Sequence, residues 1–161
     1  MAMQVVQLDV LDAKLVEILE AEPRIGVLEM SRRLAVARGT VQARLDKLIA
    51  RGAIKGFGPE VIPEAIGYGV MSFVTLELSQ RYGHQAVTDH LAEIPEVLEA
   101  HTITGSGDLL CRIVARSNAD LQRVIDQIVG YEGIVRASTI IALAELIAYR
   151  TLPLVRAASS T

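Results

Sequence analysis

The sequence contains one cysteine, Cys111, no tryptophan, and few aromatic residues, which make up 4% of its 161 positions. A single cysteine excludes an intrachain disulfide framework and any metal site built from several thiolates. With so few aromatic rings, the core must be built from aliphatic side chains. Hydrophobic residues make up 51% of the sequence, which is typical of a folded globular chain.

Long apolar segments and catalytic motifs are also missing. No apolar run reaches the roughly 20 residues of a membrane span, and the N-terminus lacks the pattern of a secretory signal. His84, His90 and His101 have no metal-ligand spacing to one another or to Cys111. Neither a phosphate-binding glycine loop nor a nucleophile–base pair is present. We therefore expect a cytoplasmic protein without metal, cofactor, membrane partner or enzyme activity.

The net charge of −3 argues against a nucleic-acid-binding protein, but the charge is unevenly distributed. Residues 1–56 contain nine basic and seven acidic side chains, whereas residues 57–161 contain seven and twelve. Within residues 31–55, Asp46 is the sole acid among seven basic residues. A local basic patch is what phosphate contact requires, whatever the total charge. These basic residues are Arg32, Arg33, Arg38, Arg44, Lys47, Arg51 and Lys55.

Helical periodicity predicts three helices in the first third of the chain. The first covers residues 10–21, where Asp9 is a candidate N-cap, and the second covers residues 27–34. The third lies within the segment 35–52, where Val41, Leu45 and Leu48 form an apolar stripe. Thr40, Arg44, Lys47 and Arg51 occupy another flank of the third helix, and Gly52 follows as a C-cap.

A helix, a short turn and a basic second helix predict a helix-turn-helix. Taken alone, the segment 35–52 is equally compatible with an ordinary surface helix whose charges are solvated. Residues 53–57 follow as a short strand that forms a wing or leaves the domain. Glycine and proline then punctuate the chain as far as Gly67, which indicates a boundary between two domains at about 53–67.

The second half of the chain has a β-α-β-β-α-β pattern, which predicts a ferredoxin-like antiparallel sheet with helices on one face. The fold class is therefore α+β: an N-terminal winged helix-turn-helix and a C-terminal ferredoxin-like βαββαβ domain. Cys111 is expected as a small core residue. The expected elements are helices over 85–94 and 119–130 and strands over 70–78, 97–104, 108–115 and 134–143, with an extension of the last strand to 149 left open.

Four stretches of the sequence, taken in order, resemble the Lrp/AsnC (feast/famine) transcription regulators over residues 7–154. The first two resemble the opening and second helices of the family, the third its recognition helix and following strand, and the fourth the signature of its regulatory domain. The stretches are Leu8-Asp9-x-x-Asp12-x-x-Leu15-x-x-x-Leu19, then Arg24-Ile25 with Leu28-Glu29-Met30-x-Arg32-Arg33-Leu34, then Thr40-Val41-x-x-Arg44-Leu45-x-x-Leu48-x-x-x-Gly52-x-Ile54-Lys55-Gly56-Phe57, and Thr104-Gly105-x-x-Asp108-x-Leu110.

The chain departs from the usual family pattern at four positions. Ala35 replaces a glycine in the turn of the helix-turn-helix, and Ala37 begins the stretch where the family has serine near the start of the recognition helix. Gly26 replaces a serine or threonine cap, and Pro59 interrupts the linker strand. These departures weaken the helix ends and leave the DNA sequence preference open, and the first turn of the third helix is expected to order fully only on DNA.

The resemblance implies that the third helix enters the major groove of double-stranded DNA. Arg38, Gln42 or Arg44 would then meet base edges, because arginine suits guanine and glutamine suits adenine. We accordingly expect Arg44→Ala to weaken operator binding without unfolding the protein. Phosphate contacts would come from Arg32, Arg33, Thr40, Lys47 and Arg51.

The resemblance also implies a small effector, most often an amino acid, bound beside the loop 104–108 at subunit contacts. Backbone N–H groups of a glycine turn suit a carboxylate, and Asp108 would accept from an α-ammonium group. From spacing alone, a plain hairpin turn is the favoured interpretation of this loop, and it is the resemblance that reverses this. The expected effector residues are Thr104, Gly105, Ser106, Gly107 and Asp108, with Ser138 and Thr139 on the last strand.

Family members dimerise through their sheets and assemble further, so the resemblance implies a homodimer that forms tetramers or octamers. A dimer would present two recognition helices roughly 34 Å, or a multiple, apart on DNA. The expected parts are a helix-turn-helix domain over 1–52, a linker strand or hinge over 53–67, a ligand-binding and oligomerisation domain over 68–154, and a flexible tail over 155–161.

Two other functions fit the same scaffold. One is a non-regulatory architectural DNA-binding protein. The other is an enzyme resembling sirohaem decarboxylases, which use histidine and arginine near a tetrapyrrole at the sheet domain. His101 and Arg112 are present here, but the basic stretch 31–55 disfavours this enzyme because a decarboxylase does not need to bind phosphates.

Overall fold

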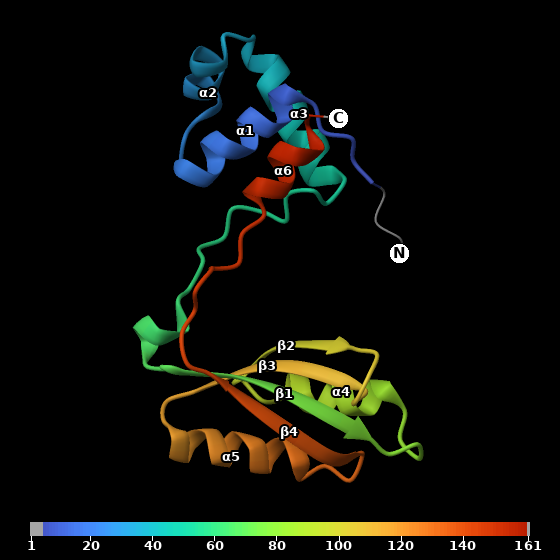
Figure 1. Cartoon of the computed structure of the whole chain (residues 1–161). Coiled ribbons are helices and arrows are strands. Elements are labelled where there is room, and N and C mark those ends of the chain that lie inside the picture. The colour runs from blue at the N-terminus through green and yellow to red at the C-terminus, as the bar shows by residue number, and fades with distance from the viewer. Residues whose placement is uncertain (1–4, 161) are drawn as a thin grey trace. The chain divides into compact units, whose positions relative to one another are not determined.

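The computed structural model describes residues 5–160 and divides them into two compact units. The first unit comprises the chain up to residue 59 together with residues from 147 onwards, and the second comprises residues 60–146 (Figure 1). Among the described residues, no helix has the length and apolar character required to cross a bilayer.

The first unit contains the three predicted helices and a fourth from the C-terminal end of the chain. Leu15, Met30, Val41 and Leu45 are buried together in its core, because each helix turns its apolar stripe inward. The helix-turn-helix is thereby confirmed. The helices are α1 (Val10–Ala21), α2 (Val27–Leu34), α3 (Arg38–Ala50) and α6 (Leu152–Ala158).

The ends of these helices are unequally capped. At the start of α1, Asp9 accepts from the backbone N–H of Asp12, and the Asp12 carboxylate accepts from the backbone N–H of Asp9. The turn after α2 places Ala35 in the left-handed region with φ 54°, where glycine is the favoured residue. Ala37 precedes α3 and offers no side-chain hydrogen bond to its first turn, as the sequence predicts.

The second unit is a four-stranded antiparallel sheet with the order β2-β3-β1-β4, which confirms the β-α-β-β-α-β prediction. Helices α4 and α5 pack against the sheet, and a short 3-10 helix, η1 (Pro63–Ile66), precedes β1. The bounds are β1 (Val70–Leu78), α4 (His84–Ala92), β2 (Val97–Thr102), β3 (Leu109–Ala115), α5 (Asn118–Val129) and β4 (Ile134–Ala142).

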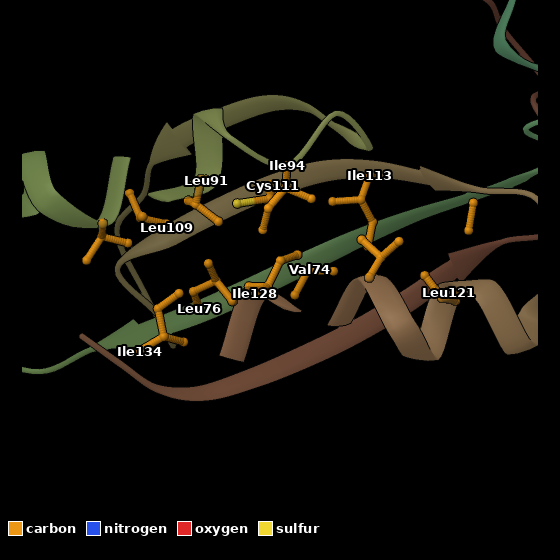
Figure 2. Packing of buried hydrophobic residues seen from close by; sticks show 13 residues of the cluster. Val74, Leu76, Leu91, Ile94, Leu109, Cys111, Ile113, Leu121, Ile128 and Ile134 are labelled. Atoms are coloured by element: carbon orange, nitrogen blue, oxygen red, sulfur yellow. The ribbon is translucent and has the colours of Figure 1, made fainter. Parts of the chain in front are cut away.

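The core of the second unit is aliphatic, as the shortage of aromatic residues predicts. Val74 and Leu76 of β1 and Cys111 of β3 point towards Leu91, Leu121 and Ile128 of the two helices (Figure 2). Cys111 is fully buried, and burial raises the pKa of its thiol to about 11. It is therefore an inert core residue, as predicted.

Two expected elements differ in the structure. Residues 53–57 form a bend followed by a segment without regular secondary structure, in place of the expected wing strand. The segment expected as a frayed tail contributes to α6, which packs against α1, and Arg156 Nε lies 2.5 Å from Glu17 Oε1. Val155, the first residue of that segment, and Leu152 just before it are half-buried, so α6 has an apolar side. Thr161, the last residue of that expected tail, lies outside the described residues.

Candidate DNA-binding surface and effector site

Helix α3 has one buried side and one exposed side. Val41 and Leu48 are fully buried and Leu45 is nearly so, which fixes the orientation of the helix against the unit's core. The opposite side is exposed and carries mainly small residues, and Gln42 and Lys47 are exposed on either flank of it. The residues along the middle of this exposed side are Gly39, Ala43, Asp46 and Ala50.

Arg44 lies on the inner flank of α3, where it contacts the start of α1. Its Nη1 donates to Oδ2 of Asp9 and, at 2.9 Å, to Oδ1 of Asp12, whose side chain is only 1% exposed. The hydrogen bond from Arg44 lowers the pKa of Asp9 below its ordinary value. This guanidinium thus holds α3 to the capped end of α1, an arrangement that differs from the base contact expected from the sequence.

Arg33 is also bound within the unit. Its Nη1 lies 2.5 Å from Glu22 Oε1, and its Nε lies 3.3 Å from Glu29 Oε1. The hydrogen bond to Glu22 raises the pKa of Arg33 above its ordinary value. Arg32 is more exposed and lies 3.7 Å from Glu29. A phosphate contact by Arg33 would therefore compete with two carboxylates.

The remaining cations of α3 are available to an external anion. Arg38, Lys47 and Arg51 are exposed and form no ion pair with residues 5–160, and Thr40 is exposed beside them. Gln42 is exposed too, and its Nε2 donates to Asp46 Oδ1 at 2.8 Å. A positively charged rim around a face of small residues suits insertion into a groove of DNA.

The loop 104–108 connects β2 to β3 and is anchored to the end of β1. Asp108 N donates to Leu76 O at 2.8 Å, and the Asp108 carboxylate accepts from Leu78 N at 2.7 Å. Gly105 has φ 120°, a conformation that favours glycine. The Asp108 carboxylate therefore has a structural partner on β1 besides any ligand it accepts.

Gly107 allows the loop to pass close to β1. A Cβ at this position would lie 2.3 Å from Thr75 Cγ2 and 3.2 Å from Leu76 O. Ser138 pairs with Thr75 across β1 and β4, whereas Thr139 pairs with Val74. Because neighbouring residues of a strand point to opposite faces, Ser138 lies on the face of Thr75 and Thr139 on the helix-covered face. The structure thus brings the loop and Ser138 towards one face and places Thr139 on the other.

The face of the sheet away from the helices carries a polar group on β2 and β3. Glu99 Oε1 lies 3.3 Å from Arg112 Nη1, and Glu99 Oε2 lies 3.3 Å from His101 Nε2. Arg112 Nε is buried without a hydrogen-bond partner among the described residues. The histidine and arginine that suggested an enzyme are thus joined through one carboxylate, a contact that is sufficient to explain their proximity.

The protein has an exposed basic helix within a helix-turn-helix, joined to a βαββαβ unit. These features place it in the class of DNA-binding proteins that are built of two parts. Family models assign the two parts: the AsnC-type helix-turn-helix domain matches residues 8–49, and the Lrp/AsnC ligand binding domain matches residues 70–152. The chain belongs to the Lrp/AsnC family of transcriptional regulators, as its resemblance implied.

The relatives agree with this assignment. The HTH-type transcriptional regulator FL11 of Pyrococcus horikoshii is 30% identical over 138 residues, which are 86% of this chain and 91% of that protein. The E. coli AsnC structure is 28% identical with a TM-score of 0.85, covering 92% of this chain and all of that one. A Neisseria meningitidis transcriptional regulator in complex with L-methionine has the same fold, with 23% identity, a TM-score of 0.81, and coverage of 91% and 97%.

Proposed function

We propose that this protein is a cytoplasmic DNA-binding transcription regulator whose assembly and affinity for DNA respond to an amino-acid effector. The observation that supports it most directly is the set of exposed cations on α3 and at its C-cap: Arg38, Lys47 and Arg51 form no ion pair with the described residues. Cations held in this way on a recognition helix are suited to phosphate contacts. The family assignment supplies the regulatory role.

The proposed DNA contacts divide by their place on the helix. Arg38 and Gln42 lie in the first half of α3, the part that meets base edges in helix-turn-helix proteins. Thr40, Lys47 and Arg51 lie on one flank, with Arg32 exposed on α2, and suit phosphate. Arg33 and Arg44 have carboxylate partners within the unit, so we propose that they position the helices.

Binding to DNA is tested by gel shift and by the salt dependence of the affinity. We expect Arg38→Ala to weaken binding to duplex DNA and Lys47→Ala to lower the slope of log affinity against log salt by about 1. Arg81→Ala is the matched control, because Arg81 is an exposed arginine in the second unit. Equal losses for Arg38→Ala and Arg81→Ala would mean that α3 is not the DNA surface.

The proposed effector site uses the backbone of Thr104–Asp108 and the side chains of Asp108 and Ser138, with Thr139 as a residue on the reverse side of β4. The L-methionine complex of the Neisseria relative supports an amino acid as the class of ligand. The glycine turn offers backbone N–H groups to a carboxylate, and Asp108 retains acceptor capacity beyond its bond from Leu78 N. The site is incomplete in one chain if the ligand lies between copies.

A thermal-shift screen of the twenty amino acids identifies the effector, because a ligand of the folded state raises its melting temperature.

Asp108→Asn tests the role of the Asp108 charge, since an amide oxygen still accepts from Leu78 N while the negative charge is lost. We expect it to remove the shift given by the effector and to leave the unliganded protein folded. Equal affinities of wild type and variant by calorimetry would contradict the assignment of Asp108.

Self-association is supported by the apolar side chains that the single chain exposes. Ile140 on the uncovered sheet face is 65% exposed, and Leu143 and Leu146 are 97% and 91% exposed. A second copy of the chain could remove these side chains from water. We propose a homodimer that assembles to tetramers or octamers, and sedimentation with and without the effector tests it.

The alternative function has its own test. Saturable binding of a tetrapyrrole, together with no binding to DNA, would favour the decarboxylase-like enzyme.

A further inference from the structure

Asp46 occupies an unfavourable position for a residue on a DNA-binding surface. It is the sole acidic residue among seven basic ones in the segment 31–55, and it is exposed on the side of α3 that faces away from the core. A carboxylate there repels the phosphates that its neighbours attract. Any favourable contribution of Asp46 to DNA binding must therefore come from a short-range contact.

The contact is the hydrogen bond from Gln42 Nε2 to Asp46 Oδ1, which measures 2.8 Å. A carboxylate accepts and does not donate, so it fixes which end of the Gln42 amide points towards Asp46. Within residues 5–160, the second hydrogen of Nε2 and the oxygen Oε1 have no hydrogen-bond partner. Gly39 and Ala43, exposed on the same side of the helix, leave these groups unobstructed.

We propose that Asp46 is a positioning residue that orients the Gln42 amide to read adenine in the major groove. This inference rests on the proposed DNA-binding function. Oε1 accepts from adenine N6, while the free hydrogen of Nε2 donates to adenine N7. Guanine presents the acceptor O6 in place of the N6 donor. An Oε1 held in place would then face O6, and two acceptors cannot form a hydrogen bond with each other. Orientation by Asp46 therefore adds discrimination against guanine.

The same pair forms elsewhere in the chain and supplies a matched control. Gln85 donates to Asp89 and Gln122 to Asp126, each at 2.8 Å, because residues four apart on a helix are neighbours. The pair is therefore a local feature of helices, and its place on α3 is what gives Gln42 a role in recognition. Asp126→Ala removes an equivalent bond in the second unit.

The experiment begins with selection of preferred sites by the full-length wild type from duplexes with a randomised centre. Competition between the selected duplex and versions with single A·T to G·C changes then measures base preference. We expect Gln42→Ala to reduce the preference for adenine at its position by on the order of tenfold. Asp46→Ala is expected to reduce it roughly threefold or more at the same position.

Asp46→Asn separates hydrogen bonding from charge. Its amide oxygen can still accept from Gln42, but its NH2 group can also donate and so fixes the Gln42 amide less well; the adenine preference should lie between those of wild type and Asp46→Ala, while affinity for all duplexes rises. Asp126→Ala should change neither quantity. The inference is overturned if Asp46→Ala keeps the wild-type preference for adenine, or if Asp126→Ala loses this preference to the same extent. It is also overturned if Asp46→Ala loses base preference at a C·G pair where Gln42→Ala does not change it. Selection of no sequence by the wild type would instead reject the proposed function.

Discussion

Arg44 Nη1 lies 2.9 Å from Oδ1 of Asp12, a carboxylate that the first unit buries almost completely. The same nitrogen donates to Asp9, so one guanidinium joins the middle of α3 to the capped start of α1. The direction in which α3 presents its exposed side therefore depends on this contact, in addition to the apolar core beneath it.

Arg44→Ala should destabilise the first unit, because it leaves the buried Asp12 carboxylate without its cation. Breaking a fully buried ion pair typically costs about 3–5 kcal/mol. Arg44 is 29% exposed, so water partly replaces it and we expect about 2 kcal/mol. Denaturant unfolding followed by signals from α1 and α3 measures the loss. Lys47→Ala is the control, because it should weaken DNA binding and leave the stability unchanged. If Arg44→Ala weakened DNA binding and kept the wild-type stability, Arg44 would instead be a DNA contact, as the sequence predicts.

The carboxylate of Asp9 makes the first unit sensitive to acid. Its pKa in the folded protein lies below the ordinary value of 3.8, because Arg44 donates a hydrogen bond to its charged form. Below that value the unfolded chain binds more protons, so this stabilisation is complete above pH 3.8 and is lost as the pH falls through the folded pKa. The difference in unfolding free energy between wild type and Asp9→Asn should shrink over this range. A constant difference down to acid unfolding would contradict the assignment.

The sequence predicts local features of this unit well and contacts between helices poorly. Asp9 is recognisable as a cap from its place before an apolar repeat, and Ala37 is recognisable as a weak one. The partner of Arg44 is not, because Asp12 and Arg44 are 32 positions apart and meet only after α1 and α3 pack. For the same reason, Arg33 resembles a free cation in the sequence, although it is paired with Glu22.

In the second unit, strand period and turns predict the kind and order of the elements, because each element reflects its own local pattern. The effector residues are less predictable. Ser138 and Thr139 look equivalent in the sequence, yet the register places them on opposite faces of β4. The docking of α6, in which Leu152 and Val155 are half-buried, is likewise hidden, since α6 packs on a helix more than 130 residues earlier.

Ala37→Ser should stabilise the first turn of α3. Ala37 has φ −62° and ψ 145°, an extended conformation that serine adopts as an N-cap. A serine oxygen would accept a backbone N–H that now lacks a side-chain partner, which is worth about 1 kcal/mol. Hydrogen exchange at residues 39–42 should be fast in the free wild type, slower in the variant, and slowed in both by DNA. Equally slow exchange in wild type with and without DNA would show that the turn is already ordered.

Gly107→Ala should destabilise the second unit, because its Cβ would lie 2.3 Å from Thr75 Cγ2. Crowding of this kind typically costs about 1–3 kcal/mol. Thr75→Ser removes that methyl group, so the double variant should recover part of the loss, while the 3.2 Å approach to Leu76 O remains. Thermal unfolding of the four proteins in a double-mutant cycle measures the coupling. Additive losses would show that the loop relaxes away from Thr75.

Removal of residues 152–161 should lower the stability of the first unit, because α6 packs on α1. Leu152 and Val155 are half-buried, and uncovering the surface they share with α1 is expected to cost about 1–2 kcal/mol. Arg156→Ala tests the ion pair to Glu17 separately and should cost less than about 0.5 kcal/mol, since both side chains are partly exposed. Hydrogen exchange in α1 distinguishes the two variants. Unchanged protection of α1 in the truncated chain would mean that α6 contributes nothing to the DNA-binding unit.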